Sequence, residues 1–342
     1  MPSFEKEATM LYQANQDLED FVQSLPKTEM HLHIEGACPF ELLQKMDPEK
    51  YADPPIFWDN DYRYESFDHF MDLYIQYCGE FFNSAQRYHE AAKIVLGRCY
   101  DQHVRYVEIS FHGGVITFIK DNGPAIIDAI KSAAPEGLEV RVFMGVCHND
   151  YKDALKGVID ECIGWERLDG IDLHGWEDMV LEPWTGEIWQ RVRDAGKFTK
   201  AHAGEFMGPD FIRQALDELK ITRIEHGVRA VEDLVLVERL VREKIGLDVC
   251  PISNLKLQVT PSMDQHPIRQ LFDAGVLVTI NSDDPFFFGN SLSEEYYAIT
   301  EDLNFTRPEL VQLAKNGFEL ALWDQSAKQK YLDELNAIAG TL

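Results

Sequence analysis

The sequence contains none of the short motifs that mark the commonest cofactor sites. No GxGxxG follows an early strand, as a dinucleotide-binding sheet requires. P-loop, HExxH and GxSxG patterns are also missing. The segment 250–253 does not supply the PCxxC of a cytidine deaminase. The sequence therefore gives no support to a nucleotide-binding α/β sheet, a zincin or a serine hydrolase.

Cysteine is sparse and scattered. The six cysteines form no CxxC pair, which argues against a zinc ribbon and against a disulfide scaffold. Cys147 and Cys250 lie in apolar, strand-like runs. We expect both to be small core residues rather than ligands.

Positive charge and long apolar runs are also scarce. Lys and Arg number 32 against 59 Asp and Glu, so the formal charge of −27 disfavours nucleic-acid and membrane-surface partners. No apolar stretch approaches the roughly 20 residues that cross a bilayer. The N-terminus shows no signal pattern and predicts an amphipathic helix with Leu11, Leu18, Phe21, Val22 and Leu25 on one period. We therefore expect a cytoplasmic protein.

Strand-like runs alternate with helical runs along the whole chain. The predicted strands are 28–33, 104–112, 139–147, 168–174, 197–202, 221–226, 246–250 and 275–282. The predicted helices are 84–102, 151–163, 184–195, 209–218, 231–243 and 267–274. Such alternation indicates a parallel sheet, and eight units predict a TIM-type (β/α)₈ barrel. We expect residues 1–342 to form one domain.

Two segments depart from this alternation. Residues 48–83 are rich in aromatic and acidic side chains, and they predict a helical insertion after the first strand that covers the barrel mouth as a lid. The alternative is a packed helical excursion without ligand contact. The segment from about 291 predicts C-terminal helices that complete the outer ring.

Histidine and acidic residues recur at the ends of the predicted strands, where barrel enzymes place their catalytic groups. His31 and His33 are two apart in a strand, so their side chains point to the same face. With His202 and Asp283 they make a plausible zinc set that leaves one position for water. Zinc lowers the pKa of bound water from about 16 to about 7. The alternative is a group of hydrogen-bonded histidines without metal.

Three further residues at these ends suit catalysis. Glu205, three residues after His202, would donate a proton if its surroundings raise its pKa, or would begin the next helix on the surface. His226 would hold the attacking water, ligate metal itself or be a core histidine. Asp284 would reach substrate through the turn at Pro285, or simply cap that turn.

The remaining histidines divide into two groups. Four fall in helix or loop contexts and are expected on the surface: His69, His89, His103 and His266. Three lie near strand ends and are candidates for lining the pocket: His112, His148 and His174.

Four blocks make the chain resemble the adenosine/adenine deaminase family of metal-dependent amidohydrolases. The blocks are 25–33, 202–205, 223–227 and 282–285, with further likeness at 170–175 and 250–254. The resemblance implies hydrolytic deamination of a 6-aminopurine at C6, with one Zn²⁺ per chain.

The resemblance also assigns roles to individual residues. It makes ligands of the proposed set His31, His33, His202 and Asp283. It implies that Glu205 protonates purine N1 and that His226 orients the attacking hydroxide. Asp284 would be the hydrogen-bond acceptor at N7, and the Gly175 N–H would approach N3.

The identity of the aminopurine stays open between adenosine and adenine. Glu35-Gly36 stands where adenosine-type members have Asp-Gly, and the longer Glu35 side chain fills space that ribose would use. The segment 170–175 leans instead towards the adenosine type. A modified, aminofutalosine-like nucleoside is a further alternative. The sequence does not indicate an oligomeric state.

Two other readings compete with a deaminase. A related metal hydrolase with two metals would carry a carboxylated lysine at the end of the fourth strand, but His174 and Gly175 stand there. A catalytically inactive purine-binding protein would have lost a ligand or Glu205, and all of them are present.

Overall fold

The computed structural model describes residue 12 and residues 14–342. Its centre is an eight-stranded parallel sheet in the order β1 to β8. The strands are β1 Lys27–His33, β2 Val104–His112, β3 Glu139–Cys147, β4 Gly170–His174, β5 Phe198–Ala203, β6 Arg223–His226, β7 Gly246–Val249 and β8 Leu277–Ile280. A bridge between Leu32 and Asp283 joins the first and last strands, so the sheet closes as the predicted (β/α)₈ barrel.

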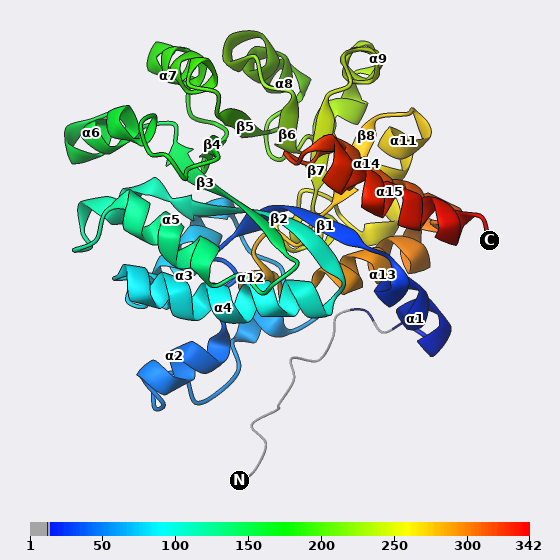
Figure 1. The fold of residues 1–342 in the computed structure, drawn as a ribbon, viewed down its shortest axis with the longest axis horizontal. Coiled ribbons are helices and arrows are strands. Elements are labelled where there is room, and N and C mark those ends of the chain that lie inside the picture. The colour runs from blue at the N-terminus through cyan, green and yellow to red at the C-terminus, as the bar shows by residue number, and fades with distance from the viewer. Residues whose placement is uncertain (1–11, 13) are drawn as a thin grey trace.

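The strands are almost entirely buried because helices cover the outer face of the barrel (Figure 1). The predicted outer helices are present as α4 Ala85–Asp101, α6 Asp153–Cys162, α7 Pro183–Asp194, α8 Pro209–Gln214, α9 Leu234–Glu243 and α11 Ile268–Asp273. Sequence periodicity missed α5 Gly123–Ser132 and α10 Pro251–Lys256. Helix α10 is fully buried and has only 6 residues, fewer than two turns, which is too short to show a helical period in the sequence.

The first and last described segments of the chain are helical, as expected. Helix α1 spans Gln16–Ser24, and the Asn15 side chain caps it by accepting a hydrogen bond from the Leu18 N–H. Leu18 and Val22 are buried, whereas Leu11 lies outside the described residues. The C-terminal helices are α13 Leu292–Leu303, α14 Arg307–Leu320 and α15 Gln325–Ala339.

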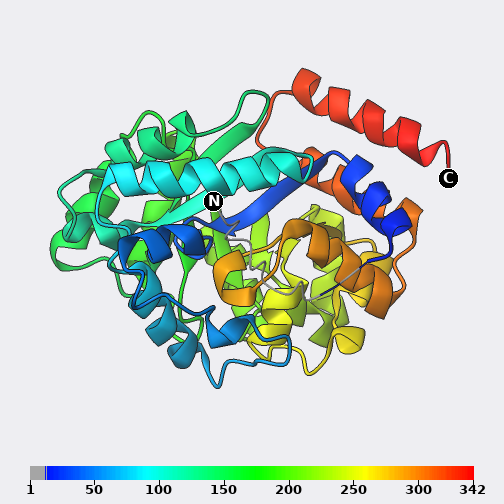
Figure 2. The same ribbon diagram turned by 90° about the horizontal axis from the view of Figure 1, so that it is seen from below.

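The insertion after β1 contains α2 Phe40–Met46, a short 3₁₀ turn at Ile56–Trp58 and α3 Phe67–Cys78. It packs against α12 Pro285–Phe288, as the blue and orange segments of Figure 2 show. The Trp58 indole N–H donates to the Phe286 carbonyl, and the Tyr64 hydroxyl donates to the Phe287 carbonyl at 2.8 Å. These bonds tie the segment before α3 to α12, and side chains of α3 line the cavity at the carboxyl ends of the strands.

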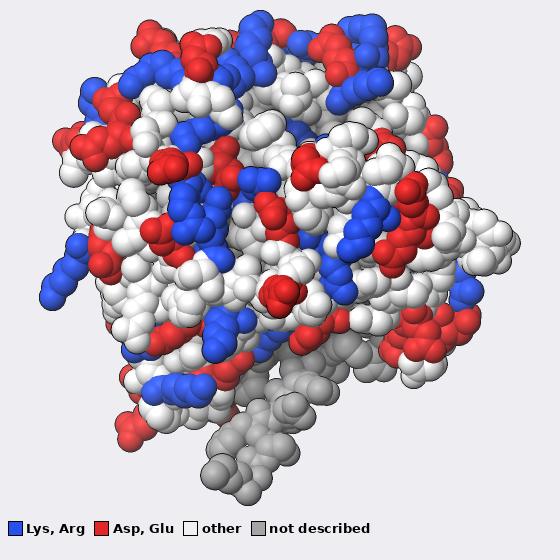
Figure 3. Space-filling model, viewed as in Figure 1, with Lys and Arg blue, Asp and Glu red and all other residues white. Residues whose placement is uncertain are grey.

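The surface carries both signs of charge. On the face in Figure 3, basic and acidic side chains are interspersed rather than gathered in separate fields. Among the described residues, no helix is long and apolar enough to cross a membrane.

Candidate active site

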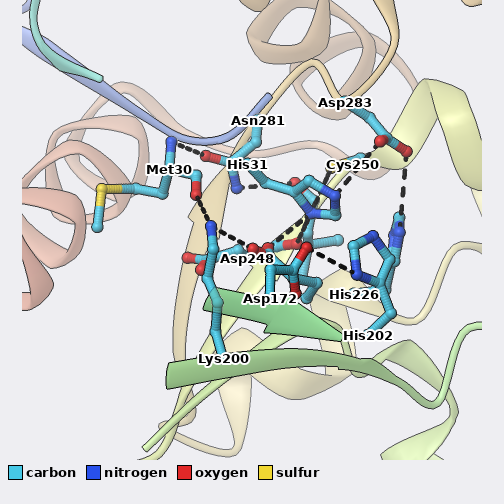
Figure 4. Close-up of polar contacts among 12 residues, drawn as sticks. Met30, His31, Asp172, Lys200, His202, His226, Asp248, Cys250, Asn281 and Asp283 are labelled. Atoms are coloured by element: carbon cyan, nitrogen blue, oxygen red, sulfur yellow. Dashed lines mark hydrogen bonds and ion pairs between the residues drawn. The ribbon is translucent and has the colours of Figure 1, made fainter. Parts of the chain in front are cut away.

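Four potential metal ligands converge at the carboxyl ends of β1, β5 and β8. The Nε2 atoms of His31 and His33 are 3.2 Å apart, and they lie 3.3 and 3.4 Å from Asp283 Oδ1. One nitrogen of His202 lies within 4.8 Å of both histidines. Figure 4 shows His31, His202 and Asp283 turned toward one another. Donors bound to one zinc ion at 2.0–2.2 Å lie about 3.4 Å apart in a tetrahedron, so this spacing fits one metal ion.

The Nδ1 atoms of His31 and His202 face oxygen atoms. His31 Nδ1 is 2.8 Å from Glu225 Oε2. His202 Nδ1 is 3.1 Å from the Leu173 carbonyl and 3.4 Å from Asp172 Oδ2. Oxygen atoms at Nδ1 favour the tautomer that leaves the Nε2 lone pair free for a metal, as outer carboxylates do in known metal sites. The donor chemistry therefore fits a zinc-like ion.

Glu205 and His226 lie beside this donor set. Glu205 Oε2 is 3.5 Å from His226 Nε2, which in turn is 3.8 Å from Asp283 Oδ2. Asn254 Nδ2 lies 3.4 Å from Glu205 Oε1. Burial, followed by the negative charge of Asp283, raises the pKa of Glu205 well above its usual value. This shift favours the protonated form of the Glu205 carboxyl group.

The surface alternative for Glu205 is wrong. Its side chain is buried, and α8 begins only at Pro209. The Glu177 carboxylate accepts hydrogen bonds from the backbone N–H groups of Glu205, Phe206 and Met207, which holds this turn inside the barrel mouth. Sequence reasoning did not identify Glu177, because the bonds join two loops that are 28 residues apart.

Asp284 packs directly against Gly36. A Cβ atom on Gly36 would lie 1.5 Å from Asp284 Oδ1, so only glycine permits this approach. The carboxyl of Asp284 borders the cavity, and its Oδ1 atom has no protein hydrogen-bond partner. Burial and the neighbouring Asp283 raise the pKa of Asp284 well above its usual value.

Glu35 is buried and lines the cavity. Its Oε1 atom accepts hydrogen bonds from the Tyr88 hydroxyl at 2.5 Å and from the His112 backbone N–H at 3.1 Å. Burial raises the pKa of Glu35 to about 7. Gly175 follows β4 with a φ of +88° and also lines the cavity.

Two of these residues adopt left-handed backbone conformations. His226 has a φ of +65° and Asp283 a φ of +63°. Such conformations are costly for residues with a Cβ atom, by about 1–3 kcal/mol, and they concentrate at functional sites. Here they allow both side chains to turn toward the donor set where their strands end.

The structure places the remaining histidines in part differently from the sequence prediction. The surface prediction for His266 is wrong, because its ring is buried and its Nε2 atom lies 3.1 Å from Asn254 Oδ1. A loop position in the sequence does not predict burial, and here the contact with Asn254 forms only in the folded chain. His112 and His174 line the cavity, whereas His148 is not among its lining residues.

Glu225 and Lys200 also escaped the sequence analysis. Glu225 pairs in register with His202, and residues paired in a parallel sheet share a face, so its carboxylate points into the barrel. Lys200 forms an ion pair with Glu225 and donates to the Met30 carbonyl at 2.9 Å. The alternation of β5 offered a signal, because Lys200 stands two residues before His202.

The donor set opens into a cavity of about 460 Å³. Aromatic and aliphatic side chains of α3 form one wall, among them Phe67, Phe70, Met71, Tyr74 and Ile75. Among the described residues, no Lys or Arg lines this cavity. It is therefore suited to a small, uncharged ligand with an apolar edge.

Known proteins are similar to this chain in sequence and in fold. The family model described as adenosine deaminase matches residues 26–338. An adenine deaminase of Acinetobacter baylyi is 32% identical over 330 residues, which cover 93% of this chain and 99% of that protein. The crystal structure of an adenine deaminase from Arthrobacter aurescens superposes with a TM-score of 0.82 at 27% identity, covering 92% of this chain and 99% of that one.

A second solved structure shares the fold of this chain. An amidohydrolase from Burkholderia ambifaria with bound Zn has a TM-score of 0.80 at 21% identity, covering 96% of this chain and 95% of that chain. Its similarity shows the fold that the two chains share. The match over nearly the full length shows that the chain belongs to the adenosine deaminase family.

Proposed function

We propose that the protein is a zinc-dependent aminohydrolase that converts adenine and water to hypoxanthine and ammonia. The observation that carries this proposal is the convergence of three imidazoles and Asp283 beside a buried Glu205 carboxyl. The sequence similarity to curated adenine deaminases supports the same reaction.

His31, His33, His202 and Asp283 would hold one zinc ion. When bound, zinc lowers the pKa of a coordinated water to about 7 and so supplies a nucleophile at neutral pH. His226 lies near both Glu205 and Asp283, where its ring orients the attacking water toward C6 of the purine.

Glu205 donates its proton to purine N1. Protonation at N1 withdraws electron density from the ring and makes C6 more electrophilic, so the effect is greatest in the transition state. The raised pKa of Glu205 keeps this proton available. Attack at C6 and departure of ammonia then leave the 6-oxopurine.

Asp284 and Gly175 orient the ring. N7 of the common adenine tautomer carries a lone pair, so its partner must donate the hydrogen bond. A protonated Asp284 meets this need, which its raised pKa supports. The direction of this bond is therefore opposite to the one expected from the family resemblance. The Gly175 N–H would donate to N3.

The free base is favoured over a nucleoside or nucleotide. Glu35 is engaged by Tyr88 and by the His112 backbone, so its side chain stays in the space that a ribose would need. A phosphate group would find no Lys or Arg among the described residues lining the cavity.

The size of the cavity favours a second candidate substrate. A volume of about 460 Å³ exceeds the space that one fused ring fills, and the α3 wall is apolar. This observation suits a modified aminopurine with an uncharged, apolar substituent.

An ammonia-release assay tests the substrate. The zinc-loaded protein is given adenine, adenosine, 2′-deoxyadenosine, AMP and aminopurines with apolar substituents. We expect the highest kcat/KM for adenine and no ammonia release from AMP. A preference for adenosine would show that Glu35 tolerates ribose and would overturn the free-base assignment. Preference for a substituted purine would favour the second candidate.

A Glu205→Gln variant tests the mechanism. Gln keeps the shape but has no proton to donate, so we expect kcat/KM to fall by about 10²- to 10⁴-fold. Metal content measured by inductively coupled plasma mass spectrometry should stay at the wild-type value. Unchanged turnover would contradict the acid role of Glu205.

A further inference from the structure

A second group of metal-binding side chains lies in the wall of the same cavity, outside the donor set described above. His112, Cys147 and His174 each offer one ligand atom, and these atoms lie within 4.8 Å of one another. His112 Nδ1 and His174 Nε2 are only 3.1 Å apart. All three residues line the cavity.

The sheet register brings these residues together. They end three adjacent strands, β2, β3 and β4, and Cys147 pairs directly with His174. Residues paired in a parallel sheet point to the same face. His112 pairs with Gly145, two residues before Cys147, so the side chains of all three residues share the inner face.

Gly145 creates the space for the two imidazoles. A Cβ atom at this position would lie 2.3 Å from Cε1 of His174. Any other residue would push the His174 ring away from His112. The close approach of the two rings thus depends on a glycine in the middle strand of the three.

The chemistry of the group suits a soft or borderline cation. Two neutral imidazoles and one thiolate are a ligand combination that zinc favours, with water completing four-fold coordination. Burial lowers the pKa of His112 and His174, which favours the neutral imidazole that offers one nitrogen lone pair to a metal. Burial and Asp150, which accepts a hydrogen bond from the Cys147 backbone N–H at 2.7 Å, raise the pKa of the Cys147 thiol, so the ion would displace the thiol proton when it binds.

We infer that His112, Cys147 and His174 form a second site for a divalent ion of the zinc class, and that occupancy of this site inhibits the enzyme. The group adjoins the proposed catalytic centre, since the ring centroids of His174 and His33 are 5.7 Å apart. Gly175, which is proposed to face purine N3, directly follows His174. A bound ion and the substrate would therefore compete for the same space.

Metal stoichiometry tests the site without reference to activity. The holoprotein is dialysed against increasing Zn²⁺, and bound metal is counted by mass spectrometry. We expect two ions per wild-type chain at saturation and one in Cys147→Ala. Cys162→Ala is the matched control, because Cys162 is buried on α6 away from the cavity, and it should retain two. One ion in wild type, or two in Cys147→Ala, would overturn the site.

Cobalt identifies the sulfur. The proposed catalytic set contains only nitrogen and oxygen ligands, so a sulfur-to-cobalt charge-transfer absorption reports the second site. We expect this absorption when the second Co²⁺ equivalent binds, and we expect its loss in Cys147→Ala. Its persistence would assign the sulfur to another residue, such as Cys250, which lies 3.5 Å from His31.

Inhibition tests the consequence, and this part rests on the proposed function. We expect excess Zn²⁺ to raise KM for adenine with little change in kcat. The inhibition constant should increase at least about 100-fold in Cys147→Ala, since losing even an outer partner of a metal costs about 10- to 100-fold in affinity. A second ion without effect on KM would refute the inhibitory role alone. Absence of adenine turnover would refute the proposed function and leave the stoichiometry result intact.

Discussion

The barrel interior holds two clusters of charged side chains that differ in how their charge is balanced. We call the group around Arg223 the lower cluster and the donor set with Glu205 the upper cluster. In the lower cluster, Arg223 donates to Glu108 at 3.0 and 3.1 Å and to Asp248 at 2.8 Å. In the upper cluster, Asp283 and Glu205 face imidazoles, and no Lys or Arg lines the cavity among the described residues. The lower cluster contains its own cations, whereas the proposed metal ion and protons would complete the upper cluster.

Lys200 and Glu225 connect the two clusters. Lys200 pairs with Glu225, and Glu225 in turn contacts His31 of the upper cluster. Burial alone would lower the pKa of Lys200, but Glu225 and Glu108 outweigh it and raise that pKa. Lys27, on the same barrel, shows the opposite behaviour. Burial, followed by the positive charge of Arg105, lowers its pKa to about 7, and its ammonium donates to the carbonyls of Val22 and Leu25.

The largest expected effect comes from removing the anionic ligand of the upper cluster. Asp283→Asn keeps the size of the side chain, and Asn tolerates the left-handed backbone at this position. Loss of the negative charge should weaken metal binding and lower kcat/KM by at least about 10³-fold. Metal content and ammonia release measure both effects. Full metal content with normal turnover would contradict the assignment of Asp283 as a ligand.

A change in the lower cluster should affect stability instead. Arg223→Leu leaves Asp248 buried without its cation and leaves Glu108 with Lys200 alone, at 3.6 Å, which we expect to cost about 3–5 kcal/mol in the free energy of unfolding. Urea denaturation measures this loss, and addition of Glu108→Gln should recover part of it. Metal content of the folded variant should be unchanged. A loss below about 1 kcal/mol would show that the network is not a stabilising unit.

The smallest effect concerns Lys27 and depends on pH. The unfolded state keeps the Lys27 proton up to a pKa of about 10.5, whereas the folded state loses it above about 7. The unfolded state therefore binds more protons between these values, and stability rises with pH in this window. Relative to Lys27→Met, wild type should gain about 2 kcal/mol between pH 7 and 9. Parallel denaturation curves at both pH values measure the difference, and a constant difference would contradict it.

Local patterns predicted the elements of the fold. All eight strands and the main outer helices lie where alternation and helical periodicity placed them, because these periods are set by the backbone geometry of each element. The buried helix α10 was missed because its 6 residues make fewer than two turns, too few for a periodic pattern. Likewise, His31, His33, His202 and Asp283 gather as strand-end positions in a barrel require, and their roles stay predictions.

The sequence by itself determined the barrel and the strand ends that carry its polar residues. The tertiary structure alone decided which side chains meet across strands. The pairing of Lys200 with Glu225, the burial of His266 and the approach of His112 to His174 depend on register and loop path. The reason is physical: repeating backbone geometry is encoded locally, whereas contacts between distant segments exist only once the barrel has closed.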